Sequence, residues 1–108
     1  MQKIALILTL LLSGHAYAAT THHCSADAQA RAKKLLELHF GLDDRMSIDS
    51  KVAVLKPMKN PAEKSQSFDV LEVWGYIYKG QYRMHFIYAQ GQSECVLMGQ
   101  EVLEYAKL

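Results

Sequence analysis

Two cysteines, Cys24 and Cys95, are the residues of this 108-residue chain whose type and spacing carry the clearest chemistry. A redox-active pair usually takes the form Cys-x-x-Cys, and these two lie far apart in the sequence. In an exported protein such a pair predicts one structural disulfide, because the compartment is oxidising. The long loop that the bond closes gives a stabilisation of roughly 4 kcal/mol in the chain-entropy model. A catalytic or metal-binding thiol is the alternative interpretation.

Histidine is the next residue type that could act near neutral pH. His39 falls at the edge of an apolar helical stripe and His85 lies among aromatic residues, so we expect structural roles for both. His22 and His23 stand near the predicted start of the mature chain. A free amine with histidine at the third position binds Cu²⁺ or Ni²⁺, but the expected cleavage after Ala18 makes His22 the fourth residue. We therefore predict no metal site.

Recognisable catalytic motifs are missing from the sequence. It contains no His-Glu-x-x-His, no Gly-x-Ser-x-Gly and no glycine-rich phosphate loop. Asp43, Asp44 and Asp49 cluster without the glycine and the spaced oxygens of an EF-hand, so we interpret them as solvated turn residues. We expect no catalytic residue and no cofactor. A hydrolase that uses His85 or His39 is the enzymatic alternative, and it needs a nucleophile or a carboxylate within about 3 Å of the imidazole.

The first 18 residues have the features of a bacterial secretory signal peptide. Lys3 precedes an apolar run from Ile4 to Leu12, and Ala16-Tyr17-Ala18 matches the small-x-small cleavage pattern. The run is too short to span a bilayer, which takes about 20 residues. We expect cleavage near Ala18, a periplasmic or secreted product, and one small domain over 19–108.

The charge composition argues against a polyanionic partner. The whole chain has 12 Lys and Arg against 11 Asp and Glu, and the loss of Lys3 leaves eleven of each. A formally neutral mature chain has no electrostatic basis for binding nucleic acid or an anionic membrane surface. We therefore predict no binding to nucleic acid and no membrane insertion, and expect the partner to be an envelope or secreted protein, or a second copy in a homodimer.

The apolar periodicity of residues 25–40 predicts one helix. Apolar residues at positions 28, 32, 35 and 36 recur at the spacing of a single buried face. Ser25 is a suitable N-cap, and Gly41 is a suitable left-handed stop, after which Leu42 is expected to pack back onto the helix.

Four strands are predicted after the helix, at about 51–56, 68–78, 81–89 and 94–105. Pro57 indicates that the first strand lies at a sheet edge or ends there, and the polar residues beyond it predict a loop. Turns at Lys79-Gly80 and Gln90-Gly91 connect the later strands as a meander. The predicted fold is α+β, with one N-terminal helix packed on a four-stranded antiparallel meander sheet.

This order of elements resembles the cystatin-like arrangement in outline, and the resemblance concerns architecture alone. The glutamine-valine-glycine inhibitory hairpin of cystatins has no counterpart here, because Val73-Trp74-Gly75 is expected in the middle of a strand. The resemblance therefore implies a fold and no function.

Counting outward from the two turns assigns the strand residues to two faces of the sheet. Cys95 is expected opposite Phe86, and Gly99 opposite Tyr82. On the other face, Trp74 is expected opposite His85, His85 opposite Val96 and Arg83 opposite Met98; a longer second turn slides the partners but keeps the faces. Because a disulfide requires the two Cα atoms to lie within about 7 Å, the face with Cys95 must lie beneath the helix. That predicted core face holds Leu71, Val73, Gly75, Ile77, Tyr82, Met84, Phe86, Tyr88, Leu97 and Gly99.

The opposite side of the sheet, which we call the far face, is too apolar for a surface that meets only water. Tryptophan, tyrosine, arginine and methionine are the types enriched where proteins bind one another. The alternatives are that cross-strand pairs only stabilise the sheet, or that a bent sheet buries part of this face itself. Ile87 and Val96 are expected on this face, and the predicted partner-binding residues are Trp74, Tyr76, Tyr78, Arg83, His85 and Met98.

These observations favour a small exported periplasmic protein that is not an enzyme and that binds a protein partner or itself. Inhibitors, immunity proteins and secretion accessory proteins belong to this class. The alternative function is the binding of a small apolar ligand between the helix and the sheet.

Overall fold

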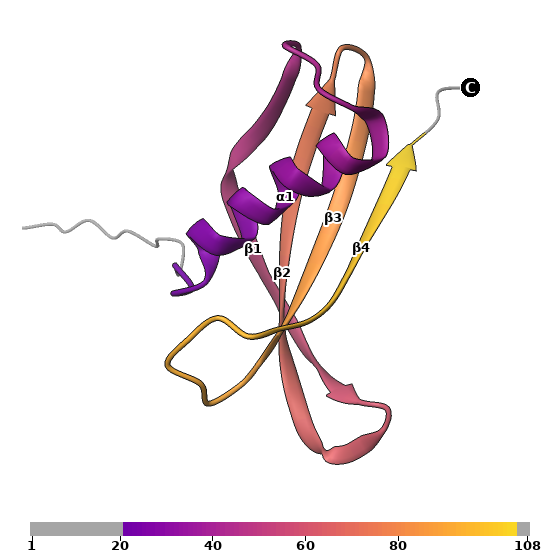
Figure 1. The fold of residues 1–108 in the computed structure, drawn as a ribbon. Helices are drawn as coiled ribbons and strands as arrows, with labels where there is room; N and C mark the ends of the chain where they lie inside the picture. The colour runs from indigo at the N-terminus through magenta and orange to yellow at the C-terminus, as the bar shows by residue number, and fades with distance from the viewer. Residues whose placement is uncertain (1–20, 106–108) are drawn as a thin grey trace, which may run out of the picture.

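The computed structural model describes residues 21–105 and shows one helix lying across one side of an antiparallel sheet (Figure 1). The four strands are neighbours in the same order as in the sequence, so the sheet is a meander. The predicted α+β fold is confirmed, and the helix has the predicted bounds. The elements are α1 (Ser25–Phe40), β1 (Met46–Asn60), β2 (Glu63–Ile77), β3 (Gly80–Ala89) and β4 (Leu97–Tyr105).

The two ends of α1 differ in detail from the expectation. The N-cap is Cys24 rather than Ser25, and it makes no capping hydrogen bond through its side chain. Gly41 does end the helix with a positive φ of 79°, but its ψ of 179° sends the chain onward. A left-handed cap would need a ψ near +47° to turn the chain back. Leu42 is consequently 88% exposed, so the prediction that it packs back was wrong. His39 is also exposed rather than at the edge of the core.

The first two strands are longer than predicted and form one extended hairpin. The polar stretches around Ser47 and Ser65 belong to strands, because long cross-strand pairing outweighs their weak local preference. Pro57 does not end β1; the register shifts between Leu55 and Met58 instead. Its missing N–H is tolerated because β1 is an edge strand, as predicted. The hairpin extends beyond the helix (Figure 1).

The turn between β2 and β3 lies one residue earlier than expected. Ile77 pairs with Gly80, so Tyr78 and Lys79 form the turn, and Tyr78 takes a positive φ of 54°. Every cross-strand partner therefore shifts by two positions: Trp74 pairs with Arg83 rather than with His85. Because side chains alternate with a period of two, this shift leaves the assignment of faces unchanged.

The last strand departs further from the predicted register. Tyr88 pairs with Leu97 and Ile87 pairs with Gly99, so Met98 is an extra residue in a bulge. The bulge reverses the parity of all later residues, and Gly99 lies on the far face rather than on the core face. Cys95 precedes the strand and does not pair with Phe86, so that prediction was wrong.

The core lies between α1 and the sheet. The helix contributes Ala28, Ala32, Leu35 and Leu36, all buried. Gly75 is the point of closest approach, since a Cβ there would lie 2.6 Å from Leu36 Cδ1. Most of the predicted core face is confirmed; Ile77 and Leu97 are partly buried against it, and the buried strand residues are Leu71, Val73, Tyr82, Met84, Phe86 and Tyr88.

Within residues 21–105 the helix is neither long nor apolar enough to cross a membrane. The predicted signal peptide, residues 1–18, lies outside the described residues.

Candidate functional site

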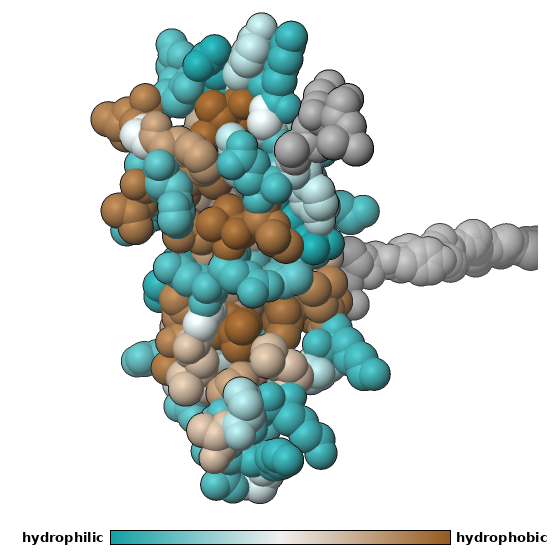
Figure 2. All heavy atoms as spheres, turned by 90° about the vertical axis from the view of Figure 1, so that its right-hand side faces the viewer, coloured by the Kyte–Doolittle hydropathy of each residue, from teal (hydrophilic) through white to brown (hydrophobic). Residues whose placement is uncertain are grey.

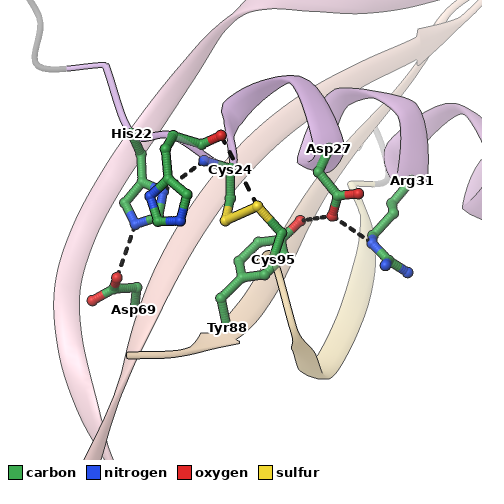
Figure 3. Close-up of a disulfide and its surroundings, with 8 residues drawn as sticks. His22, Cys24, Asp27, Arg31, Asp69, Tyr88 and Cys95 are labelled. Carbon is green, nitrogen blue, oxygen red and sulfur yellow. Dashed lines mark hydrogen bonds and ion pairs between the residues drawn. A yellow bond between two sulfur atoms is a disulfide. The ribbon is translucent and has the colours of Figure 1, made fainter. Parts of the chain in front are cut away.

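The predicted disulfide joins the start of α1 to the connection between β3 and β4 (Figure 3). Cys24 and Cys95 have Cα atoms 5.7 Å apart and a sequence separation of 71. Cys24 is 1% exposed, so this side of the bond belongs to the core. The bond holds the helix on the core face, and the inference that Trp74 lies on the opposite side of the sheet is confirmed by the register.

His22 is held in one tautomer beside this bond. Its Nδ1 accepts a hydrogen bond of 2.9 Å from the backbone N–H of Cys24, so the ring proton resides on Nε2. Nε2 then donates to Asp69 Oδ2 at 2.8 Å. Partial burial opposes ionisation of Asp69, but hydrogen bonds from His22 and Gln90 lower the pKa of this carboxyl. With both nitrogens occupied, His22 offers no lone pair to a metal unless these bonds break.

The pair His22–His23 also lies next to the sulfur of Cys24, a grouping of metal-ligand types. The thiolate needed for such a site does not exist, because the sulfur is committed to the disulfide. The two imidazole rings stack with their centroids 4.7 Å apart. His23 is exposed, and His22 is partly buried beside the disulfide.

A second polar contact ties the helix to the sheet next to the disulfide (Figure 3). The buried Tyr88 hydroxyl donates to Asp27 Oδ2 at 2.8 Å, and Arg31 Nε donates to the same oxygen at 2.7 Å. Partial burial opposes ionisation of Asp27, but these two hydrogen bonds outweigh it and lower its pKa. Burial, together with the neighbouring carboxylate, raises the pKa of Tyr88. Both groups therefore keep their roles as acceptor and donor at neutral pH.

The far face carries a row of polar side chains across three strands. Glu72, His85 and Glu101 are direct cross-strand neighbours. His85 Nε2 lies 2.9 Å from Glu72 Oε2, and its Nδ1 lies 3.0 Å from Glu101 Oε2. Each contact is a hydrogen bond only if a proton lies between the nitrogen and the oxygen. Both contacts therefore need either two protonated ring nitrogens, or one protonated ring nitrogen together with one protonated carboxyl group. The row links β2, β3 and β4 in either case.

The distance required of a hydrolase is met here, because two carboxylates lie within about 3 Å of His85. A general base also needs a nitrogen free to take a proton from a nucleophile. Glu72 and Glu101 occupy both nitrogens, and none of the hydrogen bonds within residues 21–105 joins His85 to a hydroxyl or thiol. The geometry is that of a hydrogen-bonded row across three strands.

Next to this row lies an aromatic cluster. Trp74 stacks on Tyr105 with ring centroids 5.5 Å apart and an interplanar angle of 21°. Arg83 Cζ lies over the Tyr105 ring, 5.4 Å from its centroid, and its Nε lies 3.8 Å from a Glu72 oxygen. Leu103 pairs with Arg83 in the adjacent strand. We call Trp74, Tyr76, Arg83, Leu103 and Tyr105 the far-face patch.

The structure brings together only some of the predicted partner-binding residues. Trp74, Tyr76, Arg83 and His85 all lie on the far face. Tyr78 lies in the turn, where the Arg45 and Lys79 side chains are within cation–π distance of its ring. Met98 lies at the other end of the sheet, where it lines an open hollow with Phe68, Ala89, polar residues at the start of β2 and polar residues of the β3–β4 connection.

Leu103 and Tyr105 are the members of the patch that sequence reasoning did not find. The predicted register placed Val96 and Met98 beside His85 and Arg83. The longer β3–β4 connection slides the partners by four positions and the bulge at Met98 adds one, so Glu101 and Leu103 lie there instead. A signal was present, because Leu103 and Tyr105 alternate as strand residues do. Only the bulge decides on which face they lie.

Part of the far face is buried by the sheet itself. Phe68 and Val70 belong to this face, yet they are 8% and 7% exposed. Val70 has Leu55 and Ile87 as its cross-strand neighbours, so apolar side chains flank it on both sides. The second alternative interpretation of the far face therefore holds for this end of the sheet. Exposed apolar side chains remain at both ends of this face: Leu103 and Tyr105 at one end, and Met58, which pairs with Phe68, at the other.

A separate group of exposed apolar side chains lies at the end of α1. Leu38 is 80% exposed and Leu42 is 88% exposed. They belong to the helix side of the molecule and do not contribute to the far-face patch.

Comparison with protein-family models, curated proteins and solved structures gives no match for this chain.

Proposed function

We propose that this protein is a small exported binding protein without catalytic activity, which holds a protein partner on the far-face patch. The observation that carries the proposal is an aromatic cluster: Trp74 stacks on Tyr105, and Arg83 lies over the same tyrosine ring. Leu103, which pairs with Arg83, is exposed beside it. Tyr105 and Leu103 are 42% and 46% exposed, so the patch presents apolar area to solvent. Tryptophan, tyrosine and arginine are the residues that contribute most to binding energy at protein interfaces.

Pre-organisation supports the same interpretation. Trp74 and Arg83 are each held against Tyr105 before any partner arrives. Binding to side chains that are already fixed costs less conformational entropy than binding to mobile ones. The His85 row borders the patch and fixes the three strands relative to one another. A rigid aromatic surface with a polar border has the general construction of a protein interface.

The chemistry of the chain is consistent with an oxidising compartment, because both cysteines are joined. We infer a partner that is itself an envelope or secreted protein, as for an inhibitor, an immunity protein or a secretion accessory protein. The alternative of a small apolar ligand between helix and sheet is not favoured. Leu36, Val73 and Met84 are all 0% exposed, and Gly75 leaves no room for even a methyl group beneath the helix.

The test is capture of partners from envelope extract by the immobilised mature protein. We compare Leu103→Glu with Val54→Glu, since Val54 is an apolar residue of β1 with a similar exposure of 43%. The proposal expects the Leu103 variant to lose the captured protein and the Val54 variant to keep it. A Trp74→Ala/Arg83→Ala variant serves as a second probe of the patch.

Recovery of the same partner by all three variants would refute the proposed surface. A Leu38→Ser/Leu42→Ser variant completes the set, because it removes the other exposed apolar group. Loss of the partner with this variant alone would assign binding to the end of the helix instead.

A further inference from the structure

The two edges of the sheet are protected to different degrees. A free edge strand exposes unpaired N–H and C=O groups and invites another strand to pair with it. Proteins block such edges with lysine, proline and bulges. The edge strand β1 has all three devices. It carries three register shifts along its pairing with β2, and its lysines and proline are Lys51, Lys56, Pro57 and Lys59.

The other edge strand, β4, has little of this protection. Its nine residues from Leu97 to Tyr105 include no lysine and no proline. Its one register shift lies at the Met98 end, so Gly99–Tyr105 pairs with β3 without interruption. Figure 2 views the molecule from this side, and apolar and hydrophilic side chains lie interleaved along it. In the part of the chain that the structure describes, no further strand lies beyond β4.

β4 can pair with a second copy of itself in an antiparallel register that opposes no like charges and places an aromatic residue over its glycine. With Val102 opposite Val102 of a second copy, Glu101 lies opposite Leu103, and Gln100 lies opposite Glu104. Gly99 lies opposite Tyr105, a combination in which the aromatic ring covers the glycine. No two like charges are opposed in this register. Centring the pair on Glu101 or Glu104 instead would set a carboxylate against its own copy, which is unfavourable.

We propose that β4 pairs edge to edge with β4 of a second copy of this chain, with Val102 on the twofold axis. This contact goes beyond the proposed function, because it uses the edge of β4 and leaves the far-face patch open to another partner. The two sheets become one continuous eight-stranded sheet, and the two far-face patches lie on the same side of it. The twofold axis makes the contact closed, so it yields dimers and not fibres.

The first test measures molar mass by sedimentation equilibrium over a concentration series of the mature protein. The proposal expects a mass that rises toward twice that of the monomer. Leu103→Glu places a carboxylate opposite Glu101 of the other copy, and the twofold axis repeats this unfavourable pair. The dissociation constant of the dimer should therefore rise by about 2- to 30-fold. Leu103→Lys places lysine opposite Glu101 of the other copy and should leave dimerisation intact or strengthen it. Equal weakening by both variants would overturn the register.

The second test uses cysteine crosslinking to fix the register. Residues directly opposite in an antiparallel pair have Cα atoms about 4.5–5.5 Å apart, which suits a disulfide. Val102→Cys should therefore form a crosslinked dimer under mild oxidation. In this register the two residues at position 103 are not opposite each other but two residues apart along the strands. Their Cα atoms lie about 8 Å apart, so Leu103→Cys should crosslink far less. Crosslinking of Leu103→Cys with none at Val102→Cys would contradict the proposal.

The outcomes separate this inference from the proposed function. A protein that stays monomeric at every concentration, yet loses a captured envelope protein on Leu103→Glu, would overturn self-association and leave the binding surface in place. A monomer that captures nothing, or captures equally with every variant, would overturn both. Circular dichroism of each variant verifies that the fold is retained.

Discussion

Removal of the disulfide is the perturbation whose effect the structure predicts most sharply. The double variant Cys24→Ala/Cys95→Ala leaves every strand and the helix chemically unchanged, but it frees the unfolded chain from a covalent loop. The loop spans a sequence separation of 71 residues. The chain-entropy relation gives about 4 kcal/mol at 25 °C for a loop of this length. Cys24 is also buried, so the loss of its sulfur adds a packing cost.

This loss is a large part of the whole stability of the domain, because small domains are stable by about 5–15 kcal/mol in total. In urea, where slopes of about 1–3 kcal/mol per molar are usual, the unfolding midpoint should fall by about 1–4 M. The slope itself should increase, because an unfolded chain without the crosslink exposes more surface. Wild type in the presence of a reductant should behave like the double variant.

The assay is urea unfolding followed by circular dichroism, with free thiols counted in the unfolded wild type. Ser93→Ala, an exposed neighbour of Cys95 in the same loop, is the matched control and should have the wild-type midpoint. A loss below about 1 kcal/mol for the double variant would refute the reasoning. In that case the unfolded chain would already be compact enough for the crosslink to remove little entropy.

Three further predictions follow from single contacts. Gly75→Ala should lower the free energy of unfolding in urea by about 1–3 kcal/mol, because the new methyl group would lie 2.6 Å from Leu36 Cδ1. Gly99→Ala, which has no neighbour nearer than 3.6 Å, should lower it little. Equal losses for the two variants would contradict the packing. Asp27→Asn should be less stable than wild type at neutral pH. The difference in stability should shrink as the pH falls below about 4, because the pKa of Asp27 in the folded state lies below the ordinary 3.8 and its stabilising effect is lost as the carboxylate protonates. A difference that grows on acidification would contradict the direction of this pKa shift. Long-range ¹⁵N–¹H correlation spectra should show neutral His22 as the Nε2–H tautomer, and the Nδ1–H form would contradict the hydrogen bond to its Nδ1.

Features with a strong local cause were predictable from residues alone. The helix over 25–40 follows from apolar spacing, and the structure has the same bounds. The choice of core face was correct, although Cys95 lies before β4 rather than in it; the disulfide holds the helix on that side of the sheet without fixing the register of β4. Moving the turn by one residue slides each partner by two positions, and alternation survives such a slide; the β2 and β3 faces were therefore correct while the partners were not.

The far-face patch needed the tertiary structure, and the reason is a single residue. A bulge at Met98 adds one position to β4 and reverses which side chains face the helix, so Leu103 and Tyr105 join Trp74 and Arg83. Nothing in the local sequence fixes a bulge, since its position depends on how the disulfide and the long loop before β4 set the start of pairing. The sequence alone predicted an export signal, and it determined the order of the elements and the layer in which each early strand residue lies. Only the packed structure decided which side chains of β4 meet those of β2 and β3. Only the packed structure decided that β4 forms a free edge of the sheet.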